Sequence, residues 1–120
     1  MTRILIVDNH VGFVETLSRT LKDLGHEPIG VHGGMEAIKA VINDQPDLIL
    51  LDYMMPELNG VETIFRIRSQ PEGKTIPIVI ISAISERTLE KRALAAGGNK
   101  FLQKPVDTKI IETLLKEFLE

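Results

Sequence analysis

Three short apolar runs constrain the fold more than any other feature of this 120-residue chain. They cover residues 4–7, 48–51 and 76–81, and each ends directly before a polar residue. Apolar and polar residues do not alternate within them, as they would in a strand with one face in water. Continuous apolar runs are typical of parallel strands that are covered on both faces. The sequence therefore predicts a parallel sheet between two layers of helices.

Segments with helical spacing follow the apolar runs. In the first, apolar residues recur every three or four positions from Val11 to Leu24, and Gly25 is expected to end the helix. Two weaker strands are predicted at residues 28–32 and 99–103. The other apolar stripes consist of Ala37, Ile38, Val41 and Ile42; Val61, Ile64, Phe65 and Ile67; Leu89, Ala93, Leu94 and Ala96; and Ile110, Ile111, Leu114, Leu115 and Phe118.

The resulting order is a strand followed by a helix, repeated five times. This order predicts the α/β class, as a (βα)5 doubly wound, five-stranded parallel sheet. Right-handed crossovers leave few ways to wind such a sheet, and we favour the flavodoxin-like strand order 2-1-3-4-5. Residues 1–120 are expected to form a single domain, with no output domain after the last helix.

Composition narrows the classes of partner and compartment. The formal net charge is -3, with 14 basic and 17 acidic residues, so no electrostatic argument supports direct binding of nucleic acid. No stretch approaches the length of a membrane span, and the first residues lack a signal-peptide pattern. There are no cysteines, which fits a reducing compartment. We expect a cytoplasmic protein without a membrane partner.

Polar side chains with related chemistry follow the predicted strands. They are Asp8, Asn9, Asp52, Ser82 and Lys104, and the carboxyl ends of parallel strands meet at one edge of a sheet. Each residue alone has an ordinary explanation, such as a helix cap or a solvated surface charge. Together, however, the carboxylates suit a hard cation such as Mg²⁺, and the hydroxyl and ammonium suit phosphoryl oxygens. A carboxylate can itself be the nucleophile that becomes an aspartyl phosphate.

An ordered set of short motifs accompanies these residues along nearly the whole chain. The set consists of residues 4–10 (ILIVDNH), 34–37 (GMEA), 46–56 (PDLILLDYMMP), Gly60, 77–83 (PIVIISA), 96–98 (AGG) and 101–105 (FLQKP). With these motifs at these spacings, the sequence resembles the CheY-like receiver domain of bacterial two-component response regulators. The resemblance implies a phosphorylation-dependent signalling switch, and it implies the same fold that the apolar runs predict.

The resemblance also implies roles for individual residues in phosphoryl transfer. Asp52 would accept the phosphoryl group, and Ser82 and Lys104 would bind its oxygens. Phe101 occupies the position of an aromatic switch residue, and an ordinary core or half-buried strand position is the alternative explanation. The bond between Lys104 and Pro105 corresponds to one that is commonly cis in the family.

The resemblance further implies a Mg²⁺ cofactor held by Asp8, Asn9, Asp52 and the backbone carbonyl of Met54. Most relatives carry an acid at the position of Asn9, so we expect weakened magnesium binding here. A pseudo-receiver, an interaction module that does not need phosphorylation, is therefore the main alternative. An aspartyl-phosphate phosphatase is disfavoured because Met54 stands where such enzymes usually carry a second Asp. A flavin-binding module is disfavoured by the absence of tryptophan and of a hydroxyl-rich phosphate loop.

The implied partners are proteins. A sensor histidine kinase or a histidine phosphotransfer protein would donate the phosphoryl group, as in a phosphorelay, and a downstream protein target would respond to it. A phosphorylation-dependent homodimer also fits the resemblance. The residues around Arg87, Glu90, Lys91 and Phe101 are candidates for the partner surface. The chain is not expected to be an enzyme beyond catalysing its own phosphorylation and dephosphorylation.

The residues that flank the expected phosphoryl site predict its lifetime. Met54 and Ile84 are apolar, so neither side chain can orient a water molecule for attack on the phosphoryl group. We therefore expect a long-lived phosphoryl group on Asp52. The lifetime is measured by following the phosphorylated mass after the donor has been removed, and rapid loss of that mass would contradict the expectation.

Overall fold

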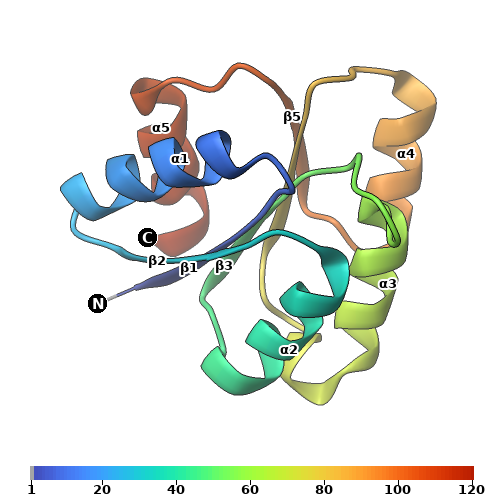
Figure 1. Cartoon of the computed structure of the whole chain (residues 1–120). Helices are drawn as coiled ribbons and strands as arrows, with labels where there is room; N and C mark the ends of the chain where they lie inside the picture. The colour runs from blue at the N-terminus through green and yellow to red at the C-terminus, as the bar shows by residue number, and fades with distance from the viewer. Residues whose placement is uncertain (1) are drawn as a thin grey trace.

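The computed structural model describes residues 2–120 and confirms the predicted fold (Figure 1). Five parallel strands form one sheet in the order β2-β1-β3-β4-β5. The strands are β1 (Arg3–Val7), β2 (Glu27–Val31), β3 (Leu48–Leu51), β4 (Ile78–Ser82) and β5 (Lys100–Gln103). The helices are α1 (Val11–Asp23), α2 (Gly34–Asp44), α3 (Gly60–Ser69), α4 (Arg87–Ala95), α5 (Thr108–Leu119) and the short 3-10 helix η1 (Pro71–Gly73). Within residues 2–120, no helix combines the length and the apolar character that a membrane span needs.

Helices cover both faces of the sheet. Helices α1 and α5 lie on one face, and α2, α3 and α4 lie on the other (Figure 1). Successive residues of a strand point to opposite faces, so Leu5 and Val7 join the core beneath α2–α4 while Ile4 and Ile6 join the core beneath α1 and α5. Two cores on opposite faces explain why the apolar runs of β1, β3 and β4 are continuous rather than alternating.

The strand register brings the carboxyl ends of four strands to one edge. Val7 of β1 is paired with Leu51 of β3, and Leu51 in turn with Ile80 of β4. Two residues further along β4, Ser82 is paired with Gln103 of β5. The residues that follow these pairs therefore lie side by side, as the sequence predicts.

Some of the apolar helix faces that the sequence predicts are wider than the faces that pack against the sheet. Phe65 is 68% exposed, and Leu94 and Ile42 are also exposed, although each was expected on an apolar face. In α3 the buried residues are Gly60, Ile64, Ile67 and the polar Thr63, whose hydroxyl donates to the carbonyl of Asn59 at 2.8 Å. Each helical residue advances by about 100°, so Phe65 is turned away from the face that Ile64 buries.

The predicted ends of the elements need only small corrections. Strand β4 begins at Ile78 rather than Ile76, and Ser82 is its last residue rather than the first residue beyond it. Helix α1 ends as predicted, because Gly25 has a φ of +89° that favours glycine. Gly97, with a φ of +122°, follows α4 in the same way.

Arg68 joins the ends of several elements on the side of the sheet opposite the carboxyl edge. Its guanidinium donates to the carbonyl of Gly97 at 2.7 Å, to that of Ile76 at 2.6 Å and to that of Gly73 at 2.9 Å. It also donates to Asn99 Oδ1 at 3.0 Å, and the same oxygen accepts from the Ile78 N–H at 2.8 Å. Burial lowers the pKa of this guanidinium. One side chain thus satisfies backbone carbonyls that precede β4 and β5.

Replacing Arg68 is expected to destabilise the fold. An Arg68→Met variant would leave partly buried carbonyls without donors, which we expect to lower the free energy of unfolding by about 2–3 kcal/mol. Urea unfolding followed by circular dichroism measures this change. Arg66→Met is the matched control, because Arg66 lies on the same helix and is exposed, and we expect a change within about 0.5 kcal/mol. Equal losses in both variants would contradict the role of Arg68.

Candidate functional site

Four candidate residues lie at the carboxyl edge of the sheet. Asp8 and Asp52 directly follow β1 and β3, Ser82 ends β4, and Lys104 directly follows β5. Asp8 is 2% exposed and Asp52 is 7% exposed, and Ser82 is fully buried. Because buried charges are costly unless they are paired, the contacts of these groups decide how the site is held together.

Lys104 is the counter-charge of the two buried carboxylates. Its ammonium donates to Asp8 Oδ2 at 2.7 Å and lies 3.8 Å from Asp52 Oδ1. The other oxygen of Asp8, Oδ1, accepts a hydrogen bond from the backbone N–H of His10 at 2.8 Å. In this arrangement Lys104 pairs directly with Asp8 and more distantly with Asp52. The peptide bond between Lys104 and Pro105 is cis, as the resemblance implies.

Asp52 is the carboxylate whose protonation is most perturbed. Its pKa is raised from 3.8 to about 6, first because burial penalises the charged form and second because Asp8 is a neighbouring negative charge. Lys104 and hydrogen bonds with the backbone of Met54 and Tyr53 act in the opposite direction, but they do not offset the first two effects. The site therefore carries more negative charge than its lysine neutralises.

The other predicted residues lie around this cluster but contact it less directly. The hydroxyl oxygen of Ser82 accepts from the Ile84 N–H at 3.1 Å. Asn9, Met54 and Ile84 are exposed at the same edge. Phe101 is half-buried against the core beneath α2–α4, so its side chain has both core contacts and access to the surface.

The donors fit a hard divalent cation. Two carboxylates, the Asn9 amide and the backbone carbonyl of Met54 are all oxygen ligands, which magnesium prefers. The raised pKa of Asp52 indicates negative charge that a cation would relieve. Within residues 2–120, no three side chains of His, Cys, Asp or Glu gather as a metal-binding group, so backbone, amide or water oxygens would have to complete the coordination.

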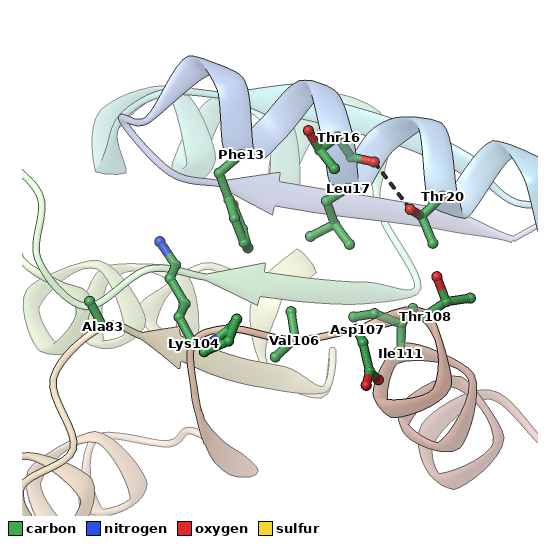
Figure 2. A pocket seen from close by; sticks show the side chains of 11 residues that line it. Phe13, Thr16, Leu17, Thr20, Ala83, Lys104, Val106, Asp107, Thr108 and Ile111 are labelled. Atoms are coloured by element: carbon green, nitrogen blue, oxygen red, sulfur yellow. Dashed lines mark hydrogen bonds between the residues drawn. The ribbon is translucent and has the colours of Figure 1, made fainter.

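The sequence did not indicate the aromatic neighbour of Lys104. Phe13, on α1, places its ring centroid 4.2 Å from Lys104 Nζ, and Figure 2 shows the two side chains facing each other. Beyond them, α1 and the segment from Lys104 to Ile111 enclose a groove of about 620 Å³. Phe13 stands four residues before Leu17 on the same helix, which is a signal for an inward-facing residue, but its pairing with Lys104 depends on how α1 meets β5.

Comparisons with known proteins agree with this geometry. The family model described as "Response regulator receiver domain" matches residues 4–116. Response regulator MprA of Mycobacterium ulcerans is 36% identical over 103 residues, which cover 86% of this chain and 44% of that protein. Protein PilH of Pseudomonas aeruginosa is 32% identical over 116 residues, covering 97% of this chain and 93% of PilH. The chain thus spans less than half the length of the MprA relatives and nearly all of PilH.

Solved structures with the same fold include signalling proteins. Chemotaxis protein CheY4 of Vibrio cholerae superposes with a TM-score of 0.94 at 27% identity, covering 99% of both chains. The receiver domain of sensor histidine kinase PA1611 from Pseudomonas aeruginosa superposes with a TM-score of 0.90 at 26% identity, covering 98% of this chain and 96% of that one. In that structure a magnesium ion is coordinated in the active site cleft.

The raised pKa of Asp52 predicts a pH-dependent contribution to stability. Because the folded-state pKa of about 6 exceeds the ordinary aspartate pKa of 3.8, the folded protein binds the proton more tightly than the unfolded chain. Stability from this group is fully present below pH 4 and is lost as the pH rises through about 6. We therefore expect the effect of Asp52→Asn on the free energy of unfolding to differ between pH 4 and pH 8. Allowing for solvent screening, the effect at pH 8 should be more stabilising than the effect at pH 4 by roughly 1–2 kcal/mol.

Urea unfolding in metal-free buffer at the two pH values measures this difference. Asp23→Asn is the control, because Asp23 is exposed on α1 and its replacement should have the same effect at both pH values. Carbon NMR of the Asp52 carboxyl should show a titration midpoint near pH 6. A midpoint near 4 would contradict the burial argument.

Proposed function

Since this chain belongs to the response regulator receiver domain family, we propose that it is a signalling switch that accepts a phosphoryl group on Asp52. The donor is the phosphohistidine of a sensor histidine kinase or of a histidine phosphotransfer protein. The observation that carries the proposal is the buried contact of Lys104 with both Asp8 and Asp52 at the carboxyl edge of the sheet. The chain catalyses only the gain and the loss of its own phosphoryl group.

The transfer is a substitution at phosphorus. A carboxylate oxygen of Asp52 forms the new O–P bond while the N–P bond to the donor's imidazole breaks, and the imidazole nitrogen keeps the electron pair. The reaction needs Asp52 in its charged form, which a pKa of about 6 leaves as the major form at neutral pH. The ammonium of Lys104 can then exchange its hydrogen bond with Asp8 for one with an oxygen of the phosphoryl group, because it lies 2.7 Å from Asp8 and 3.8 Å from Asp52.

Magnesium belongs to the same proposal. Asp8, Asp52, Asn9 and the carbonyl of Met54 would hold the ion, which when bound supplies positive charge to the transferring phosphoryl oxygens. Asn9 ligates through an uncharged amide, so the site has one negative charge fewer than an acid at that position would give. We infer that magnesium binds more weakly for this reason.

The response to phosphorylation involves the strands beside Asp52. Ser82, at the end of β4, would turn its hydroxyl to the phosphoryl oxygens and so would disturb its bond with the Ile84 N–H. Phe101, half-buried on β5, would move further inward as the loop after β4 shifts. The surface around Arg87, Glu90 and Lys91 on α4 would then bind a downstream protein or a second copy of the chain. Such a response is a shift between two packings of one fold.

Intact-mass spectrometry after incubation with acetyl phosphate tests the proposal. We expect one added phosphoryl group on the wild type and none on Asp52→Asn, because the amide of asparagine lacks the carboxylate oxygen that would attack phosphorus. Asp47→Asn is a matched control, because Asp47 is exposed at the opposite end of β3, and it should be phosphorylated like the wild type.

A magnesium titration separates the transfer from the metal. Asn9→Asp is expected to lower the magnesium concentration needed for half-maximal phosphorylation by about tenfold, because it adds a charged ligand. No adduct at any magnesium concentration would contradict phosphoryl transfer and would favour an interaction module that does not need phosphorylation.

A further inference from the structure

The aromatic contact of Lys104 has no part in the transfer described above. Phe13 lies in the first turn of α1, and its side chain is half-buried between that helix and the chain after β5. Its ring centroid is 4.2 Å from Lys104 Nζ, well within the distance of about 6 Å at which a ring face attracts a cation. The ammonium of Lys104 therefore has two carboxylates and one aromatic face as neighbours.

A neighbour that restricts the ammonium matters here because the side chain of Lys104 is flexible. The side chain is 21% exposed and has four rotatable bonds. Hydration of the ammonium and other rotamers of the side chain therefore compete with the position beside Asp52. Asp8 holds it at 2.7 Å, while Asp52, the proposed nucleophile, is 3.8 Å away. If Asp8 turns to a metal ion, Lys104 loses its shortest contact, and the ring of Phe13 is the neighbour that remains on α1.

An aromatic ring suits this position better than a charged or an aliphatic side chain. A third carboxylate would add repulsion to a site whose negative charge already exceeds its positive charge. An aliphatic side chain would exclude water but would not attract the ammonium. The ring attracts the cation through its quadrupole and carries no net charge, so it does not compete with phosphoryl oxygens for Lys104.

We propose that Phe13 is a positioning residue for phosphoryl transfer. Its ring keeps the ammonium of Lys104 beside Asp52 while that ammonium exchanges its hydrogen bond with Asp8 for one with the phosphoryl group. The proposal rests on the proposed function, because it gives Phe13 a role only through Lys104. It also connects the site to the groove of about 620 Å³ between α1 and residues 104–111, because Phe13 and Lys104 form part of the groove's wall (Figure 2).

The contact itself has a spectroscopic signature. In the wild type, the ring current of Phe13 should shift the ε-CH₂ proton signals of Lys104 to higher field in carbon–proton NMR spectra. Phe13→Tyr keeps a ring and should keep the shift, whereas Phe13→Leu keeps apolar bulk and should abolish it. A Lys104 signal unchanged by Phe13→Leu would overturn the proposal whether or not the chain is phosphorylated.

The role in transfer is tested by the rate of phosphorylation with acetyl phosphate at saturating magnesium. We expect Phe13→Leu to be about twofold to fivefold slower than wild type, the factor that an attraction of about 0.5–1 kcal/mol gives, and Phe13→Tyr to restore the rate. Phe65→Leu, at an exposed position on α3, is the matched control and should react like the wild type. Thermal unfolding of each variant shows whether it is folded. If Phe13→Leu is unfolded, Phe13→Met takes its place.

A double-mutant cycle distinguishes positioning from a general effect on packing. If Phe13 acts through Lys104, Phe13→Leu should have no further effect on the rate in a Lys104→Met background. An equal slowing in both backgrounds, or a Phe13→Leu rate equal to wild type, would overturn the role of Phe13 while leaving the proposed function intact. A wild type that takes no phosphoryl group would overturn the proposed function and the role of Phe13 together.

Discussion

The contact of one lysine with two buried carboxylates determines how the rest of the site is arranged. Asp8 and Asp52 are almost completely buried, and two such charges repel each other unless a cation lies between them. Lys104 supplies that cation from the end of β5, at 2.7 Å from Asp8 and 3.8 Å from Asp52. Burial raises the pKa of Asp52, and the charge of Asp8 raises it further because a single positive charge does not balance both acids. In the proposed function, this surplus of negative charge would favour a bound magnesium ion.

The parallel sheet is what makes this contact attainable. Asp8, Asp52 and Lys104 belong to three different strand ends, and Lys104 is far from Asp8 in sequence. Because neighbouring strands run in the same direction and in register, all three ends lie at the same edge. The continuous burial of β1, β3 and β4 keeps that edge rigid, and the hydrogen bonds of Arg68 hold the opposite end of β4 and β5. In the proposed function, the loops at this edge can therefore move when a phosphoryl group is added, while the sheet keeps its structure.

The resting arrangement and the proposed phosphorylated state differ chiefly in what Lys104 pairs with. Lys104 now pairs with Asp8, Ser82 accepts from the Ile84 N–H, and Phe101 is half-buried. The contacts of Lys104 and Ser82 are polar contacts outside the two apolar cores, and Phe101 packs at the margin of the core beneath α2–α4. The ring of Phe13 is the exception in the proposed scheme, since it remains with Lys104 in both states. The groove beside Phe13 therefore borders the part of the site that changes its charge.

The sequence by itself determined the alternation of strands and helices in a parallel sheet and the edge at which the polar residues meet, and it left the strand order as a choice among a few windings. Continuous apolar runs specify strands that are covered on both faces, and the polar residue at the end of each run specifies the edge. Only the tertiary structure decided that Lys104 pairs more closely with Asp8 than with Asp52, that Phe13 faces Lys104 and that Arg68 donates to three backbone carbonyls. It also decided that Phe65 lies in solvent. Periodicity encodes which face of an element is apolar, but distances of a few ångströms between side chains depend on how distant elements pack, and those distances determine charge pairing and pKa.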